Sequence, residues 1–318
     1  MRTKLLLLSL LLLLQVALAF ALGVNRSSLQ AFNAQLPLLK MKQTTPDRLV
    51  FEGSAKQQLV LQKQTGDWNL PDHFGARADR AKVDQLLQSL IGLKRPWPVA
   101  ESADAASRFK VAADDFERRL TFLQGDKQLD RLLLGTSPGF RKVHARVAGE
   151  TTIYDIPFST YQVSLKPEDW VDKTLLQLQP EQISAIDLAD CKLVKQAGRL
   201  EVADLGAGEQ TDAKQVAELL DKLAHLTILD VSAKSEQLSD EPAALSFTLH
   251  LSDGSQRSYR FISTAEGADQ QLLVTDQPTL FKVSSGLQGE LAAYTRKMLV
   301  QPRPAETTAA SAERSQQQ

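Results

Sequence analysis

The residue types that most often do chemistry in proteins are few in this chain and widely spaced. Four histidines stand at His73, His144, His225 and His250, and no two of them have HxH or HxxxH spacing. The single cysteine, Cys191, has no partner for an intramolecular disulfide and cannot form a cysteine-based metal cluster. No combination of nucleophile, base and orienting residue is indicated. We therefore expect no catalytic, metal-binding or cofactor-binding residues, and a protein that is not an enzyme.

Two glycine-containing segments could in principle bind phosphate. Gly206-x-Gly208 precedes a predicted helix, but Glu209 follows it, and the segment lacks the third glycine and the Lys-Ser/Thr of a phosphate-binding loop. The carboxylate of Glu209 would oppose a phosphate group. The segment from Gly135 to Gly139 is typical of a turn between strands. We interpret both segments as turns.

Two tryptophans and two aspartates could each form a functional pair. Trp68 and Trp170 could form an aromatic binding pair, but a later segment of similar pattern has Leu200 in place of Trp68, which favours core packing. Asp79 and Asp212 each stand at the start of a predicted helix. They could form a cation site, but a carboxylate facing the helix dipole, worth about 0.3–1 kcal/mol, is the interpretation that we favour.

The charge pattern gives no indication of a nucleic-acid partner. The 318 residues carry a formal net charge of −1. The charged residues of Glu117-Arg118-Arg119 and of Asp126 to Arg131 alternate in sign. Such alternation is typical of a solvated face rather than of a basic stripe that binds phosphates.

The N-terminus has the pattern of a membrane anchor. Arg2 and Lys4 precede an uncharged run from Leu5 to about Val24, and about 20 apolar residues can span a bilayer as a helix. The leading positive charges favour a cytoplasmic N-terminus and an exported body. The alternative is a signal peptide cleaved after Ala17-Leu18-Ala19, but the apolar run continues past that site. We expect a single-pass protein of the bacterial inner membrane with its C-terminal body in the periplasm.

The sequence pattern predicts two similar amphipathic helices around which the chain is organised. In the segment from Ala78 to Leu93 the apolar residues recur at helical spacing, and the segment from Thr211 to Leu226 repeats the pattern. The matching apolar pairs are Val83 and Val216, Leu86 and Leu219, Leu87 and Leu220, Leu90 and Leu223, and Leu93 and Leu226. A duplication at the scale of a domain is the simplest explanation.

Short segments with turn residues between them surround both helices, which favours antiparallel sheets over βαβ units. The predicted fold class is therefore α+β, with two similar two-layer units, each an antiparallel sheet packed on an amphipathic helix, after an N-terminal transmembrane helix. The predicted boundaries are 1–24 for the anchor or signal peptide, 25–46 for a linker, 47–179 and 180–301 for the two repeats, and 302–318 for a disordered tail.

The end of each predicted repeat also shows a common pattern. We interpret the latter part of the first repeat, from Glu168 to Leu175, as a short helix, and Leu287 to Met298 as the closing helix of the second. The segment from Tyr294 to Leu299 matches that from Trp170 to Leu175.

Five segments together carry a resemblance to a known family: GDWNL, ADRAKVDQLLQSLIGLK, LTFLQGDKQLDRLLLG, VHARVAGETTIYDIP and EDWVDKTLLQL. From about Asp47 to Leu299 the chain resembles the bacterial domain-of-unknown-function family numbered 4340. The second copy of the pattern departs from that of the family, because this copy lacks the turn tryptophan and the alanine before Asp212. The resemblance implies no catalytic activity and no assigned functional residues.

The resemblance also implies an association with ABC-type export systems of the gliding-motility auxiliary kind. We therefore expect a non-catalytic interaction or accessory module of such a system, with the permease or auxiliary subunits as partners. The alternative is a periplasmic protein that binds a small molecule or glycan in the cleft between the two repeats, because ligand pockets prefer domain interfaces. An envelope hydrolase ranks last, because no motif supports it.

Overall fold

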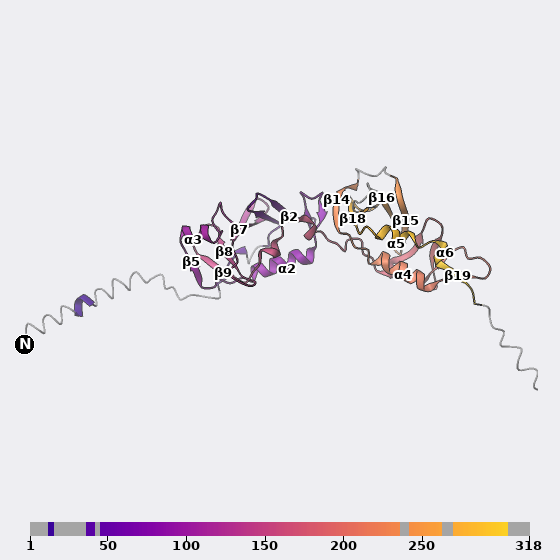
Figure 1. Ribbon diagram of the computed structural model, residues 1–318, viewed down its shortest axis with the longest axis horizontal. Coiled ribbons are helices and arrows are strands. Elements are labelled where there is room, and N and C mark those ends of the chain that lie inside the picture. Colours follow the sequence, from indigo (N-terminus) through magenta and orange to yellow (C-terminus); the bar gives the residue numbers. More distant parts are fainter. Residues whose placement is uncertain (1–11, 16–35, 42–44, 236–241, 263–269, 305–318) are drawn as a thin grey trace, which may run out of the picture. The chain divides into compact units, whose positions relative to one another are not determined.

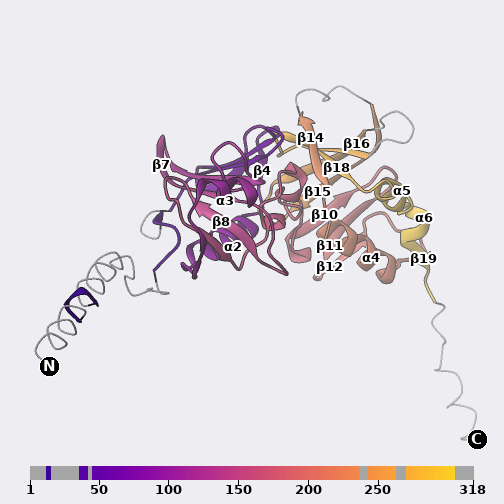
Figure 2. The ribbon, with the colours of Figure 1, turned by 60° about the vertical axis from the view of Figure 1, so that its left-hand side comes forward.

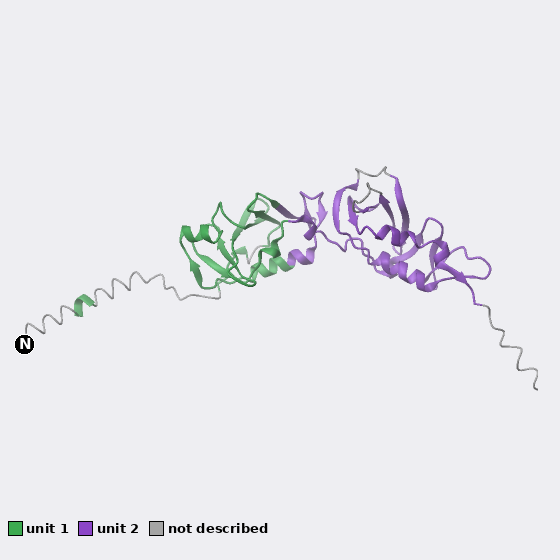
Figure 3. Cartoon of the chain, in the orientation of Figure 1, with its two compact units in different colours: residues 1–58, 85–165 green, residues 59–84, 166–318 purple. Residues whose placement is uncertain are grey.

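The computed structural model describes residues 12–15, 36–41, 45–235, 242–262 and 270–304 (Figure 1). Most of the predicted anchor, most of the predicted linker and residues 305–318 of the predicted tail lie outside these ranges. Among the described residues, no helix is both long enough and apolar enough to cross a membrane. The chain divides into two compact units, of residues 1–58 with 85–165 and of residues 59–84 with 166–318 (Figure 3).

Unit 1 contains six neighbouring strands of a nine-stranded sheet, paired antiparallel in the order β1-β6-β7-β8-β9-β5. Alternate residues of β1 are buried, as expected for a strand with one face on a core. The short helix α3 begins after Ser102, whose hydroxyl accepts from the N–H of Ala105 at 3.2 Å. The elements are β1 (Arg48–Gly53), β5 (Pro98–Ala100), α3 (Ala103–Arg108), β6 (Arg118–Gln124), β7 (Lys127–Leu134), β8 (Val143–Val147), β9 (Ile153–Ile156) and the 3-10 turn η2 (Thr160–Val163).

Unit 2 contains an eight-stranded antiparallel sheet, in the order β12-β11-β10-β15-β16-β17-β18-β14, and a two-stranded ribbon of β13 and β19. Helices α4 and α6 contact each other close to β19 (Figures 1 and 2). The elements are η3 (Pro167–Asp169), η4 (Pro180–Gln182), β10 (Ile183–Asp187), β11 (Lys192–Gln196), β12 (Arg199–Val202), β13 (Glu209–Thr211), α4 (Ala213–Ala224), β14 (Asp230–Lys234), β15 (Ala243–Leu251), β16 (Gln256–Ile262), β17 (Gln270–Val274), β18 (Thr279–Val283), α5 (Leu287–Ala292), α6 (Arg296–Leu299) and β19 (Val300–Pro302).

Unit 2 also includes residues 59–84, a segment that contains three strands and the first residues of a helix. Strands β2 (Gln58–Gln64), β3 (Asp67–Leu70) and β4 (Ala76–Arg77) form an antiparallel meander. Helix α2 (Arg80–Ile91) follows, and its residues from Gln85 onward belong to unit 1. The predicted apolar stripe of α2 is buried, since Val83 and Leu90 are fully covered.

The protein is therefore α+β with mostly antiparallel sheets, as predicted, and both amphipathic helices are present. The predictions at the ends of the repeats need correction. The closing helix is interrupted, because Thr295 adopts extended backbone (φ −94°, ψ 167°) and begins the separate helix α6. Of the helix predicted from Glu168 to Leu175, only the 3-10 turn η3 is present, which ends at Asp169 with Trp170 as its C-cap residue. Strands β5, β13, β14 and β19 are short and were not predicted.

Candidate functional site

All four histidines are paired with a carboxylate, and three of these pairs are partly buried, each in a different part of the fold. These three pairs are His73 Nε2 with Asp230 Oδ1 at 2.8 Å, His144 Nδ1 with Asp155 Oδ1 at 2.6 Å, and His250 Nε2 with Asp187 Oδ2 at 2.7 Å. The fourth pair is exposed: Nδ1 of His225, the C-cap residue of α4, lies 3.1 Å from Oδ1 of Asp221. Within the described ranges, no group of three or more His, Cys, Asp or Glu side chains could hold a metal ion.

The pair of His250 and Asp187 resembles part of a catalytic triad most closely, but the nearby hydroxyls are engaged elsewhere. Ser184 Oγ donates to the carbonyl oxygen of His250 at 3.0 Å, and the hydroxyls of Thr248 and Ser258 bond each other at 2.8 Å. Burial raises the pKa of Asp187, but hydrogen bonds from His250 and Lys192 outweigh this effect and hold the pKa below its ordinary value. Within the described residues the geometry is that of a histidine–carboxylate pair whose neighbouring hydroxyls are bonded to other groups.

Cys191 is a poor nucleophile in this environment. Burial raises the pKa of its thiol to about 11, and the neighbouring carboxylate of Asp190 adds to the increase. Because the thiolate is the reactive form, little of it is present near neutral pH.

The glycine segments form turns, as predicted. Gly208 has a φ of +86°, and the backbone N–H of Gly206 donates to the carboxylate of Glu209 at 2.7 Å. The same carboxylate pairs with Arg296 at 2.6 Å. A donor that a phosphate would need is therefore already used by Glu209.

The tryptophans and the two aspartates have structural roles, as the favoured interpretations predicted. Trp68 and Trp170 are 2% and 0% exposed. The carboxylate of Asp79 accepts from the N–H of Lys82 at 3.0 Å, and that of Asp212 caps α4 by accepting from two backbone N–H groups. Each aspartate satisfies helix donors that would otherwise lack a partner.

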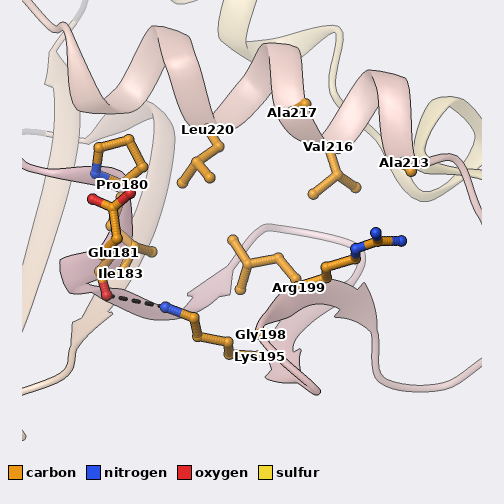
Figure 4. A pocket seen from close by; sticks show the side chains of 11 residues that line it. Pro180, Glu181, Ile183, Lys195, Gly198, Arg199, Ala213, Val216, Ala217 and Leu220 are labelled. Carbon is orange, nitrogen blue, oxygen red and sulfur yellow. Dashed lines mark hydrogen bonds between the residues drawn. The ribbon is translucent and has the colours of Figure 1, made fainter.

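A cavity of about 340 Å³ lies between α4 and the hairpin of β11 and β12 in unit 2 (Figure 4). Leu220 and Val216 of α4 point toward the hairpin, and Lys195 and Arg199 stand on its strands. The lining residues are Pro180, Glu181, Ile183, Lys195, Gly198, Arg199, Leu200, Ala213, Val216, Ala217 and Leu220. The sequence interpretation did not anticipate this cavity, although it did identify Leu200 as a replacement for a tryptophan.

A larger depression, of about 960 Å³, lies in unit 1 beside the loop between β7 and β8. Two aromatic residues on its lining are almost fully exposed, Phe140 at 87% and Tyr161 at 93%. The guanidinium carbon of Arg141 lies 5.1 Å from the centre of the Phe140 ring. No motif marked this surface, because isolated aromatic residues in polar loops carry no periodic signal.

With this geometry established, comparison with known proteins identifies the family. The family model described as a domain of unknown function, DUF4340, matches residues 68–245, which is more than half of the chain. The chain belongs to the DUF4340 family. No curated protein and no solved structure matches it.

The matched segment is shorter than the predicted resemblance from Asp47 to Leu299, but it covers both amphipathic helices of this DUF4340 protein. It also contains every residue that lines the cavity beneath α4 and the two exposed aromatic residues of unit 1.

Proposed function

We propose that the protein is a non-catalytic docking module, tethered to the bacterial inner membrane by residues 1–24, whose body lies in the periplasm and serves an ABC-type transport system. The tether follows from the apolar N-terminal run and its leading cations. The transport system is the partner that the family resemblance implies. The partner surface is the depression in unit 1.

The observation that carries the proposal is the exposure of Phe140 and Tyr161 on one depression. Contiguous exposed apolar surface is uncommon on a protein without a partner and marks interaction sites. Aromatic residues and arginine are the types that contribute most to protein–protein interfaces. Arg141 and Lys142 line the same depression, so an acidic and apolar partner surface fits it best.

The proposal includes the duplication of one ancestral domain. Its support is the strand order, β1-β6-β7-β8-β9-β5 in one unit and β10-β15-β16-β17-β18-β14 in the other. Each series has a long insertion at the same point in the chain, after its first strand, and each insertion contains a hairpin and an amphipathic helix.

Site-specific photocrosslinking in intact cells tests the docking surface. A photoreactive phenylalanine analogue replaces Phe140 or Tyr161, and the same analogue replaces Lys127, an exposed residue of unit 1 outside the depression, as the matched control. We expect a crosslink to a transporter permease or auxiliary subunit from the two aromatic positions and not from position 127. Equal or absent crosslinking at all three positions would count against the docking surface.

Fractionation tests the tether separately. We expect the full chain to remain with the membrane after alkaline carbonate extraction, and its body to become accessible to protease when the outer membrane is opened. Release of the chain into the carbonate supernatant would contradict the anchor and favour the cleaved signal peptide.

A further inference from the structure

The cavity beneath α4 has the size and lining of a small-molecule site. Ligand pockets usually range from about 300 to 1,000 Å³ and are mostly apolar, with a few polar groups that fix orientation. At about 340 Å³ this cavity lies at the small end of that range. Ile183, Leu200, Val216 and Leu220 supply its apolar surface.

The hairpin of β2 and β3 offers a direct comparison with that of β11 and β12. In the first, Lys63 pairs with Trp68, and in the second, Lys195 pairs with Leu200. Both hairpins turn through two residues with positive φ, Thr65-Gly66 at 48° and 100° and Ala197-Gly198 at 46° and 85°. Trp68 and Leu200 therefore occupy the same position in two hairpins of the same geometry.

The two positions differ in how they are filled. The indole of Trp68 is 2% exposed, so an aromatic ring is buried at this position of the first hairpin. At the corresponding position of the second hairpin, Leu200 is the smaller side chain and lines a cavity. The group that the second hairpin lacks is an aromatic ring.

Helices α2 and α4 differ in a similar way, because α4 carries the smaller side chains at two corresponding positions. Counted from the aspartates at the helix starts, Arg80 and Asp84 of α2 correspond to Ala213 and Ala217 of α4. The first two form an ion pair at 3.5 Å, whereas the two alanines line the cavity. Small apolar side chains on α4 thus leave room where α2 carries a charged pair.

The two hairpins also carry opposite charges at the position that precedes Trp68 in the first and Leu200 in the second. Asp67 of the first hairpin faces Arg77 at 3.5 Å, whereas the matching residue of the second hairpin is Arg199. The side chain of Arg199 is exposed, and its guanidinium makes no hydrogen bond or ion pair with any described residue. The other cation at the rim, Lys195, donates to the backbone carbonyl of Glu181 at 3.0 Å (Figure 4). Figure 4 shows Arg199 at the end of the cavity opposite Glu181.

We propose that this cavity binds a small aromatic carboxylate, with its ring between α4 and Leu200 and its carboxylate on Arg199. The ring takes the position that Trp68 occupies in the first hairpin. Arginine suits the acid group, because its planar guanidinium can bind a carboxylate through two parallel hydrogen bonds. This site is independent of the docking surface in unit 1.

Calorimetric titration of the full chain with indole-3-acetate tests the proposal, with indole and acetate as the two halves of the probe and hexanoate as a non-aromatic acid. We expect indole-3-acetate to bind more tightly than indole, acetate or hexanoate. Failure of indole-3-acetate to bind at millimolar concentration, or equal binding of hexanoate, would overturn the proposal.

Two variants and one control localise the binding. Leu200→Trp should abolish binding by placing the chain's own ring in the cavity, and Arg199→Gln should weaken indole-3-acetate about tenfold, which is about 1.4 kcal/mol, while leaving indole unchanged. Asp67→Asn, at the corresponding position of the first hairpin, should bind normally. Should Leu200→Trp not fold, Ala217→Asp, which introduces the residue found in α2, takes its place. Unchanged binding in a folded cavity variant would place the ligand elsewhere and overturn the assignment.

Discussion

The backbone N–H of Asp79 donates to the carbonyl oxygen of Trp170 at 2.7 Å, and Asp212 and Leu299 are joined in the same way at 2.8 Å. In both cases the residue that precedes an amphipathic helix is held by a segment from far along the chain. The structural counterpart of Trp170 is therefore Leu299, whereas the sequence comparison had matched Leu299 with Leu175. Burial of Trp170 and Leu299, each 0% exposed, explains why an apolar residue is found at both positions.

Removal of either helix cap should cost a similar amount of stability. Asp79→Ala and Asp212→Ala each leave backbone donors of the first helical turn without a side-chain acceptor. We expect each variant to lower the free energy of unfolding by about 1 kcal/mol, as measured by urea denaturation. The asparagine variants are the matched controls, because asparagine retains an acceptor oxygen. A loss of the same size in the asparagine variants would show that charge rather than capping is responsible.

Exchanging residues between the two hairpins should have opposite effects. Trp68→Leu removes buried ring atoms and opens a cavity, so we expect it to lower the stability by about 2 kcal/mol. Leu200→Trp adds apolar contacts within a cavity that already exists, so its thermal midpoint should be equal to or above that of the unmodified chain. Differential scanning calorimetry of both variants checks the contrast. A large loss of stability in Leu200→Trp would show that the cavity cannot accommodate a ring.

Sequence patterns predicted the fold class and both long helices, because the leucines of α2 and α4 recur at helical spacing. They also predicted the turn at Gly206 to Gly208, because closely spaced glycines between two periodic segments are a strong local signal. The short strands β5 and β14 were missed, since three to five residues do not establish a period.

The cavity was missed for a different reason. Leu200 was interpreted as a simple exchange within a core, and that interpretation assumed that neighbouring residues close the space left by the smaller side chain. Ala213 and Ala217 do not close it, and their contribution depends on how α4 faces the hairpin. This is a three-dimensional relationship that neither segment reveals alone.

Gly135 should be the least replaceable glycine of unit 1. A Cβ atom at this position would lie 1.8 Å from the carbonyl oxygen of Phe109, a backbone atom that cannot move aside without disturbing the chain around it. We expect Gly135→Ala to prevent folding of the unit or to lower its stability by several kcal/mol, on the order of other severe steric clashes. Gly139→Ala is the matched control, because a Cβ there meets no atom within 4 Å. Circular dichroism with thermal melting distinguishes the two variants.

Glu52 should stabilise the folded protein at neutral pH and lose this effect in acid. The hydrogen bond from Arg119 holds the pKa of Glu52 below its ordinary value. A carboxyl group with a lowered folded-state pKa stabilises the fold above its unfolded-state pKa, about 4.3, and this contribution is lost as the pH falls through the folded-state pKa. We expect Glu52→Gln to be less stable than the unmodified chain at pH 7 and to lose less stability between about pH 5 and pH 3. Identical pH profiles would contradict the role of the pair.

Asp130, in contrast to Glu52, should lower the stability of the folded protein at neutral pH. Burial raises its pKa, although the backbone N–H groups of Lys40 and Met41 donate to its carboxylate at 2.6 and 2.8 Å. A carboxyl group with a raised folded-state pKa loses stabilising effect as the pH rises from its unfolded-state to its folded-state pKa, so the ionised form is unfavourable at pH 7. Asp130→Asn keeps an acceptor for both N–H groups without the charge. We expect it to be more stable than the unmodified chain at pH 7 in urea denaturation, and Asp130→Ala, which lacks the acceptor, to be less stable.

Cys191 should resist alkylation in the folded protein. With burial and Asp190 raising its pKa to about 11, its thiolate fraction at pH 8 is on the order of 10²-fold below that of an ordinary thiol with a pKa of about 8.5. We expect iodoacetamide to label the native chain far more slowly than the urea-unfolded chain at pH 8, with a rate that rises with pH toward 11. Asp190→Asn should speed labelling of the native chain, because it removes the nearby negative charge and leaves the burial unchanged. Equal labelling rates for native and unfolded protein would show that the thiol is neither buried nor held in its protonated form.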